Sequence, residues 1–561
     1  MLPIILIMSI LCQGHAVDYG TDFVTAFPEN LAYYFPVELS LKLKITTFLP
    51  TTDVTIIMNG VIINRMIPDI PQVFDVNIPG AEVNQLGVSN NSIRIISDKK
   101  ITVLSINKRG DSIQTNVVPP TTRLGVEYLV PSPNYTKLAV QLNTYNPSNF
   151  IDSTTVPMDF SYRLIIINAE AVENSVTVTQ KLPDGDEVTT MKLDPFALTQ
   201  LPSSSFWFKV SSTAKVAVIL TNPCMDTQNC RCNMVAHQLR PTDFLGTEFI
   251  FPPINTTVKH LFVTSAKRVD LSSGSETKTV EPGSIGMLPF LPGLDTGNPS
   301  LTTSQPASLR VIQPGLIIDL LPKTMFSGCY LVHRTTQTQS LALVIVATGQ
   351  KNDVRMGPDP LSGVTWNDIS NAEYSWALID LDRCKSCVIW HPTSQIAVYV
   401  FETSLTGVRY GGPAISVNDI PDPNGCVVVP IEFELVNITL SWQASRAQCI
   451  SKGMVLASPN INYTQNKMVA ALNNMNAEGV AWLGLRRSLV SSEWYWHSKV
   501  DFNFANWDNN QPASGLCVSM RMEPDGNFTW SSVRCCSPML PLCAREMVIM
   551  GTINDLSTYL L

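Results

Sequence analysis

Three cysteines and one histidine lie close together in the sequence and could bind a metal ion. They are Cys224, Cys230, Cys232 and His237. Thiolate sulfur and imidazole nitrogen are common ligands of zinc. In an exported chain, however, such cysteines pair as disulfides. The N-terminal residues favour export, so we expect disulfides here and no metal.

A further pair of cysteines has the spacing Cys384-x-x-Cys387. This spacing occurs in redox proteins, but it lies here outside any alternation of strands and helices, which favours a local structural disulfide. Cys329 brings the cysteines of this region to six. Six cysteines allow fifteen pairings, and the sequence leaves the choice among them open.

The chain contains no Gly-x-Ser-x-Gly, His-Glu-x-x-His or phosphate-loop motif. The histidines after residue 16 have no nucleophile–base or metal spacing: His237, His260, His333, His391 and His497. We therefore predict a protein that is not an enzyme and uses no cofactor. An extracellular hydrolase with carboxylates on different strands is the weaker alternative.

The N-terminus has the features of a signal peptide. Residues 2–11 are apolar, and Gly14 and Ala16 place small residues at the cleavage positions. We predict a signal peptide over residues 1–16, with a buried first strand as the alternative. Its removal takes Cys12 and leaves twelve of the thirteen cysteines. No later segment has the ~20 apolar residues of a membrane span, which predicts a secreted, extracellular protein.

The composition predicts several folded cores. Of 561 residues, 45% are hydrophobic and 15% are charged, which excludes a disordered chain. The net charge of −8 lacks the basic surface of a nucleic-acid-binding protein. The length corresponds to three or four domains of ~150 residues. Six sequons permit glycosylation: Asn90, Asn134, Asn255, Asn437, Asn462 and Asn527.

Alternation of apolar and polar residues dominates residues 17–405 and predicts a mostly β fold. Residues 37–46 alternate as in a strand with one buried and one wet face. Turn signals such as Asn59-Gly60 separate the strands. No convincing amphipathic helix precedes residue 440.

A signature of glycine, any residue, an acid, an aromatic and an aliphatic residue occurs three times, at Gly20, Gly125 and Gly246. Similar strands close the first two copies and recur later, at residues 97–107, 212–222 and 394–400. Units of ~100 residues favour repeated β-sandwich-like units over propeller blades. Chance similarity among strands of similar composition is the alternative.

Residues 406–425 are rich in glycine and proline and are predicted to form a linker. A smaller α+β domain follows over residues 426–546, and residues 547–561 form a tail. One helix is expected after Ser441 and another after Thr464. Half of the ten tryptophans follow residue 480 in this domain.

Six ordered motifs occur in the C-terminal domain. They are Trp442 before Cys449, Ala481-Trp482-Leu483-Gly484-Leu485, Trp494-Tyr495-Trp496, Asn506-Trp507, Gln511-Pro512, and the set Cys517, Trp530, Cys535 and Cys543. In order and spacing this domain resembles C-type lectin-like domains. The resemblance implies the disulfides Cys449–Cys543 and Cys517–Cys535. Cys536 is an alternative partner of Cys517, and Cys426 would bond to the unused one, so that each part of the chain pairs its own six cysteines.

Calcium-binding members of that family carry carboxylates in three places, because calcium requires six to eight oxygen ligands. This sequence has Gln511-Pro512-Ala513, Gly515-Leu516 and Trp530-Ser531-Ser532 there. Every carboxylate is missing, so we predict no calcium at this site. A calcium-independent surface for sugar or protein is expected instead, formed by Trp507, Asn509, Gln511 and Arg521. The alternative places Trp507 in the core.

Three stretches of the N-terminal region carry a second resemblance. They are residues 124–128, 215–249 and 395–411. They resemble the N-terminal module of the IgGFc-binding protein family over most of residues 20–415. The resemblance implies a secreted all-β module of mucosal and adhesive proteins, whose relatives bind immunoglobulin Fc or help to organise mucus.

These features predict a secreted recognition or adhesion protein of mucosal or extracellular surfaces. Its expected partners are glycoproteins, mucins or immunoglobulin Fc-like proteins, with no nucleic acid and no membrane span. The alternative is a structural mucus or matrix component without a dedicated ligand site.

Overall fold

The computed structural model divides the chain into two compact units. Unit 1 comprises Met1–Cys426 and Met550–Leu561, and unit 2 comprises Val427–Ile549. The structure describes residues 17–32, 37–131, 162–182, 184–202, 207–226, 232–250, 260–273, 276–281, 286–289, 300–335, 339–369, 373–382, 384–404, 409–429, 431–498, 502–522, 528–545 and 548–550. The predicted signal peptide, Cys230 and the sequons Asn134, Asn255 and Asn527 lie outside these ranges. Among the described helices, none has the length and apolarity to cross a membrane.

Three sheets of unit 1 repeat one strand order. The first copy has β1 (Tyr19–Thr25), β3 (Leu39–Thr47), β4 (Val54–Met58), β5 (Val61–Met66), β6 (Val73–Asn77), β9 (Ile93–Arg109) and β10 (Ser112–Val118). The second has β11 (Gly125–Leu129), β12 (Arg163–Asn168), β13 (Asn174–Leu182), β14 (Gly185–Leu193), β15 (Leu198–Leu201), β16 (Trp207–Asp226) and β17 (Cys232–Gln238). The third has β18 (Gly246–Ile250), β19 (His260–Thr264), β20 (Val269–Ser273), β21 (Glu276–Val280), β22 (Gly286–Pro289), β23 (Ser300–Gln313) and β24 (Leu316–Asp319). The orders β5-β4-β9-β3-β6, β14-β13-β16-β12-β15 and β21-β20-β23-β19-β22 correspond strand by strand.

One long strand in each copy takes part in both halves of the sheet. The first half of β9 pairs with β1 and β4, and the second half pairs with β10 and β3. β16 and β23 pair with the corresponding strands of their own copies. The apolar faces of these strands form the buried clusters of the copies. The predicted repeats are therefore three-dimensional units, and two predicted closing strands lie within β9 and β16.

A fourth copy follows, which the glycine signature did not indicate. It has β25 (Cys329–His333), β26 (Ser340–Ala347), β27 (Arg355–Met356), β28 (Asp359–Pro360), β29 (Asn367–Ile369), β30 (Tyr374–Asp380), β31 (Ser386–Trp390), β32 (Ala397–Thr403), β33 (Arg409–Pro413) and β34 (Ile415–Asn418). The counterpart of the long strand is divided into β31 and β32, so the two halves form separate sheets.

The predicted linker over residues 406–425 is wrong in its described part. β33 pairs with β32, and β34 pairs with β25. Gly411 has a φ of +145°, and a Cβ at this position would overlap with the Val400 carbonyl oxygen. The glycine that suggested a linker instead allows two strands to approach closely.

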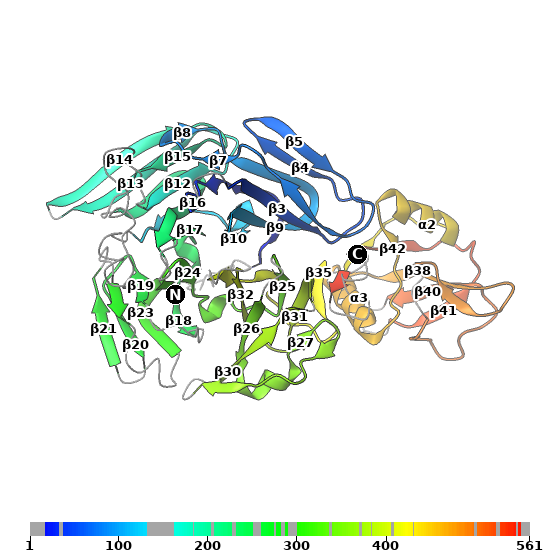
Figure 1. Cartoon of the computed structure of the whole chain (residues 1–561). Helices are drawn as coiled ribbons and strands as arrows, with labels where there is room; N and C mark the ends of the chain where they lie inside the picture. The colour runs from blue at the N-terminus through cyan, green and yellow to red at the C-terminus, as the bar shows by residue number, and fades with distance from the viewer. Residues whose placement is uncertain are drawn as a thin grey trace, which may run out of the picture. The chain divides into compact units, whose positions relative to one another are not determined.

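The four copies are arranged as a closed ring in unit 1. In Figure 1 they follow one another in chain order from blue through cyan and green to yellow-green. β10 contacts β17 and β33, and β24 contacts the same two strands. The ring closes where the Asp18 N–H donates to the Ser416 carbonyl (2.6 Å) and the Ser416 N–H donates to Asp18 Oδ2 (2.9 Å).

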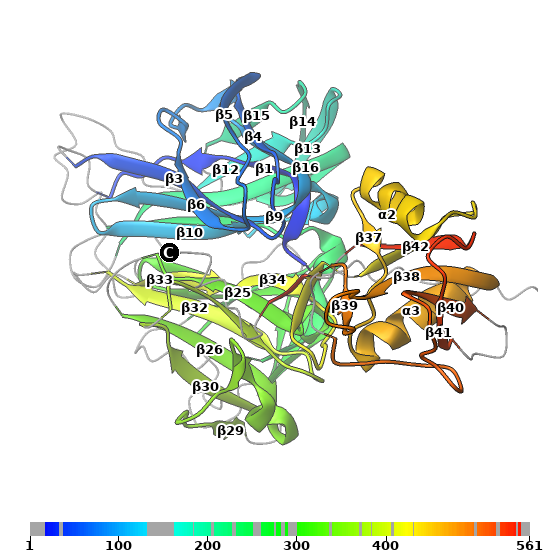
Figure 2. The same cartoon turned by 90° about the vertical axis from the view of Figure 1, so that its right-hand side faces the viewer.

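Unit 2 is an α+β domain. Its sheet runs β36 (Glu432–Leu435), β42 (Leu540–Arg545), β38 (Gly479–Arg487), β40 (Cys517–Met522) and β41 (Trp530–Val533), with β37 (Val455–Leu456) and β39 (Trp494–Trp496) at its sides. α2 (Trp442–Ser451) and α3 (Asn462–Asn474) flank this sheet (Figure 2). Ser441 caps α2 by accepting the Ala444 N–H (3.3 Å). α3 begins before Thr464, whose hydroxyl donates to the Ile461 carbonyl (2.9 Å).

The domain boundaries differ slightly from the prediction. Unit 2 begins at Val427, and β35 (Cys426–Val429) forms a two-stranded sheet with β43 (Val548–Met550). The first residues of the predicted tail are therefore a strand. Residues 551–561 lie outside the described part.

Five disulfides are present among the described cysteines. They are Cys224–Cys232, Cys329–Cys426, Cys384–Cys387, Cys449–Cys543 and Cys517–Cys535. The last two are the pairs that the lectin resemblance implies. The predicted bridge between Cys426 and Cys535 or Cys536 is wrong, because Cys426 lies beside Cys329 at the end of unit 1. Cys536 is a free, exposed thiol.

Candidate functional site

Trp507 forms part of an aromatic cluster in unit 2. Its ring centroid lies 5.1 Å from that of Trp494 and 5.9 Å from that of Trp530. Trp530 is fully buried, and Trp507 is partly buried against the same core. The residue therefore combines the two interpretations of the sequence: one part packs in the core, and another part remains at the surface.

Gln511 points its amide oxygen into the protein. Oε1 accepts the Ser532 N–H (3.0 Å), the Ser532 hydroxyl (3.0 Å) and the Ala513 N–H (3.1 Å). The Ala513 N–H also donates to Ser532 Oγ (2.7 Å). Gln511 and Ser532, which stand at two of the positions where calcium-binding relatives carry ligands, are thus hydrogen-bonded to each other. With three donors on one oxygen, Gln511 serves the loop as an internal brace.

Asn509 and Arg521 are both exposed. Trp530 separates the segments that carry them, because the Asp508 N–H donates to the Trp530 carbonyl (2.9 Å) and Met520 pairs with Trp530 across β40 and β41. Two strand spacings amount to about 10 Å. The backbones of the two segments therefore lie about two strand spacings apart, on either side of the Trp530 strand.

The structure also places the predicted glycosylation sites and the histidine and cysteines that could have bound a metal ion. The sequons Asn90, Asn437 and Asn462 are exposed. His237 contacts Asp319 in a different copy, and Cys224 and Cys232 are bonded to each other. Within the described ranges, no three His, Cys, Asp or Glu side chains form a group that could hold a metal ion.

A second candidate site is a cavity of about 150 Å³ in unit 1, where residues of all four copies meet. Asp18, Arg123, His237, Arg240, Asp319 and Glu402 bring charged or titratable groups to its wall. Arg123 pairs with Asp18, and Arg240 Nη2 lies 2.6 Å from Asp319 Oδ2. Pockets with convergent polar groups are the usual location of ligand sites.

Burial shifts the titration of these groups. Burial lowers the pKa of His237 below its ordinary value, although Asp319 opposes the shift. Burial also raises the pKa of the Asp319 carboxyl, but Arg240, Arg310 and His237 outweigh it and lower this pKa overall. The result is a neutral imidazole beside an ionised carboxylate. The sequence points to His237 but not to Arg240, Arg310 and Asp319. Arg310 and Asp319 are charges within the apolar strands β23 and β24, and Arg240 follows β17.

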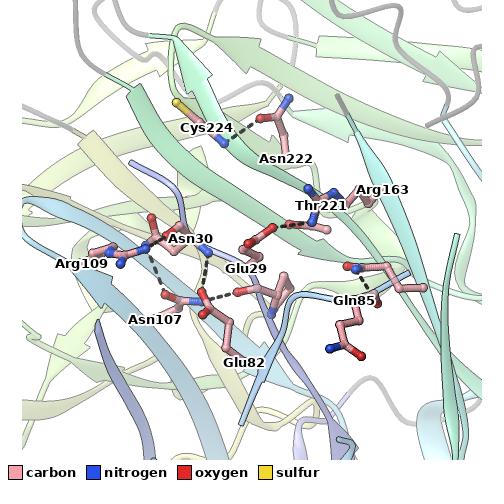
Figure 3. A network of polar contacts seen from close by, with 12 residues as sticks. Glu29, Asn30, Glu82, Gln85, Asn107, Arg109, Arg163, Thr221, Asn222 and Cys224 are labelled. Atoms are coloured by element: carbon pink, nitrogen blue, oxygen red, sulfur yellow. Dashed lines mark hydrogen bonds and ion pairs between the residues drawn. The ribbon is translucent and has the colours of Figure 1, made fainter. Parts of the chain in front are cut away.

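A separate polar network joins the first two copies of unit 1 (Figure 3). The Asn30 N–H donates to Glu82 Oε1 (2.9 Å), and Arg109 Nη1 donates to the Asn30 carbonyl (2.6 Å). Arg163 Nη1 lies 2.6 Å from Glu29 Oε2. Because these groups bond to one another, the network is a structural joint between copies.

Comparison with known families agrees with this division of the chain. The family model described as IgGFc binding protein matches residues 114–401, and the model described as Lectin C-type domain matches residues 438–545. Human IgGFc-binding protein is 21% identical over 350 residues, which are 58% of this chain and 6% of that protein. Human lymphocyte antigen 75 is 26% identical over 130 residues, which are 21% of this chain and 7% of that protein.

Solved structures of C-type lectin type match about a fifth of this chain. Human lithostathine covers 21% of this chain and 92% of its own, with 18% identity and a TM-score of 0.20. Herring type II antifreeze protein covers 21% of this chain and 92% of its own, with 20% identity and a TM-score of 0.19. The chain spans only a small part of the curated relatives that it matches.

Proposed function

Since this chain belongs to the IgGFc-binding protein family and carries a C-type lectin domain, we propose that it is a secreted recognition and adhesion protein. Its two domains are of binding rather than enzymatic types. We propose glycoproteins, mucins or immunoglobulin Fc-like proteins as partners, at mucosal or other extracellular surfaces. The name of the human IgGFc-binding protein supports an Fc-like partner for the N-terminal region.

We further propose that the lectin domain binds its ligand without calcium. The observation that carries this proposal is the use of Gln511 Oε1 by Ser532 and Ala513. A calcium ion at this position would have to displace three hydrogen bonds and would find serine and alanine where carboxylates are required. The exposed residues Asn509 and Arg521 would then contact the ligand directly.

Binding of the whole chain to immobilised mucin, glycans and immunoglobulin Fc tests both parts of the proposal. We expect saturable binding to at least one of them that a chelator leaves unchanged. Loss of binding in the chelator would contradict calcium independence. Self-association of a chain that binds none of these partners would favour the structural alternative, and turnover of a glycoprotein would favour the hydrolase.

Two arginines provide a matched pair of variants. Arg521→Ala removes a side chain of the proposed surface, whereas Arg534→Ala removes an exposed arginine beyond the other end of β41. We expect the first to weaken ligand binding at least tenfold and the second to leave it unchanged. Equal effects would show that the ligand lies elsewhere.

A further inference from the structure

The charges around the cavity in unit 1 balance one another. Among the residues that the structure describes, its wall carries three carboxylates and two guanidinium groups, from Asp18, Asp319, Glu402, Arg123 and Arg240. A third guanidinium belongs to Arg310, which does not line the cavity but pairs with Asp319 (Nε to Oδ1, 3.3 Å). His237 and His333 are neutral, because burial lowers the pKa of both. A charged ligand would therefore add a charge without a counter-ion, whereas a neutral ligand preserves the balance.

Two buried donors of the wall have no acceptor within the described protein. They are Gln238 Nε2 and Arg123 Nε, and both residues line the cavity. Arg123 already uses Nη1 for Asp18, and its guanidinium lies over the Phe244 ring, 5.1 Å from the centroid. A buried donor without an acceptor destabilises a protein. A ligand that fills the cavity should therefore bring uncharged oxygen atoms that accept hydrogen bonds.

The wall also offers acceptors. Asp18 accepts one hydrogen bond on each carboxylate oxygen, from Arg123 and from the Ser416 N–H. A carboxylate has about four acceptor sites, so Asp18 retains lone pairs for a further donor. A ligand that suits both features must accept and donate hydrogen bonds without carrying a charge. Hydroxyl groups do both.

The size and the apolar part of the cavity limit the ligand further. Its volume of about 150 Å³ is close to that of an engineered cavity that binds benzene, which leaves room for one six-membered ring. Carbon surface in the wall comes from Leu239, Phe244, Ile317 and Leu321. Water would satisfy the polar groups but would gain nothing from this apolar surface. A single ring that carries hydroxyl groups on a carbon skeleton suits both parts of the wall.

We propose that the cavity binds one neutral sugar residue. Its hydroxyl oxygens accept hydrogen bonds from Gln238 and Arg123, and one of its hydroxyl groups donates to Asp18. Two sources share this chemistry: the terminal residue of a neutral glycan and a free monosaccharide. The site lies in unit 1 and is independent of the ligand surface proposed for the lectin domain.

Calorimetric titration of the whole chain with the methyl glycosides of glucose, galactose, mannose and fucose tests the proposal, with methyl glucuronide as the charged comparison. We expect one saturable site for at least one neutral glycoside and at least tenfold weaker binding of the glucuronide. An oligosaccharide that ends in the same sugar distinguishes the sources: equal affinity identifies a glycan, and loss of binding identifies a free monosaccharide. Binding of none of the neutral glycosides, or equal binding of the glucuronide, would overturn the proposal.

Two glutamines give a matched pair of variants. Gln238→Leu removes a buried donor that lines the cavity, and Gln313→Leu removes a buried donor, also without an acceptor in the described protein, that does not line it. We expect the first to weaken binding of the neutral glycoside at least tenfold and the second to leave it unchanged. Thermal unfolding of the free proteins shows that both variants are folded. Equal affinities of the two variants would contradict the proposal.

Arg521→Ala separates this site from the surface proposed for the lectin domain. We expect this variant to bind the neutral glycoside as the unchanged protein does, even where its binding of a larger glycoprotein is weakened. Loss of glycoside binding in Arg521→Ala would place the sugar in unit 2 and overturn the proposal for the cavity.

Discussion

His333 shows how burial controls a titratable side chain in unit 1. Its Nε2 lies 3.2 Å from the Thr46 hydroxyl and its Nδ1 lies 2.8 Å from the Ser386 hydroxyl. Burial, helped by the nearby Lys44, lowers the pKa of His333 to about 3. The side chain therefore joins the first and fourth copies as a neutral imidazole.

The stability of unit 1 should fall in mild acid because of this residue. The unfolded chain binds the proton near pH 6.5, whereas the folded chain binds it only near pH 3, so stability is lost as the pH falls through this window. At pH 5 the loss amounts to about 2 kcal/mol. Chemical unfolding at pH 7 and pH 5 measures it. In the variant His333→Gln, the difference in unfolding free energy between pH 7 and pH 5 should be smaller by about 2 kcal/mol. An equal difference in the variant and the unchanged protein would show that His333 does not control the pH dependence.

The Gln511 brace predicts a second effect of a single side chain. Gln511→Leu leaves the Ser532 N–H and the Ser532 hydroxyl without the acceptor that they share, which should cost about 1–3 kcal/mol. Asn509→Leu, at an exposed position two residues earlier, should change stability by less than about 0.5 kcal/mol. Thermal unfolding of the two variants makes the comparison. Equal losses would mean that the brace contributes nothing.

At the level of strands, the glycine signature marks the joints between copies. A Cβ on Gly20 would lie 2.5 Å from the Pro120 Cβ, and Gly125 and Gly246 stand in the same way against Pro241 and Pro322. In the first two copies the acid of the signature pairs with a cation of the long strand, as Asp22 does with Arg94 and Glu127 with Lys209. In the third copy Glu248 pairs with Lys323, which lies after the long strand. The aromatic residue of each signature is buried: Phe23, Tyr128 and Phe249.

Replacement of a signature glycine should therefore disrupt the joint. In Gly125→Ala the added methyl group overlaps with the Pro241 ring, and such overpacking costs about 1–3 kcal/mol. Gly349→Ala is the control, because a Cβ there meets no atom within 4 Å. Thermal unfolding should show a lower Tm for the first variant only. Equal Tm values would mean that the strands adjust without cost.

For unit 1 as a whole, the ring depends on contacts between residues that are far apart in the chain. Asp18 and Ser416 close it, and Cys329–Cys426 ties together the two ends of the fourth copy. The Leu321 N–H donates to the Tyr399 hydroxyl (2.8 Å) and joins the third copy to the fourth. Loss of one of these contacts should weaken the entire ring.

Removal of the Cys329–Cys426 bridge tests this dependence. The bridge spans 97 residues, so its loss should cost about 4–5 kcal/mol through the entropy of the unfolded chain. Cys384–Cys387 spans three residues and should cost about 2 kcal/mol. Double serine variants at each pair are compared by thermal unfolding. If removal of Cys329–Cys426 lowered the stability less than removal of Cys384–Cys387, the stability of unit 1 would not depend on this bridge as expected.

Patterns between near neighbours were readable from the amino-acid sequence. Alternation predicted the strands of unit 1, the glycine signature predicted three of its four copies, and the tryptophan and cysteine motifs predicted the lectin domain. Each depends on residues a few positions apart or on a motif in fixed order. The fourth copy was missed because Gly328, which packs against Pro421, lacks the acid that follows the other glycines.

The pairing of distant residues followed from the three-dimensional arrangement. Cys426 appeared to belong with the lectin cysteines, but the strands of the fourth copy bring it to Cys329. The orientation of Gln511 and the meeting of Arg240, Arg310 and Asp319 likewise depend on which strands pair. Local sequence sets the face that a strand buries, whereas strand order in the folded ring selects which buried groups meet.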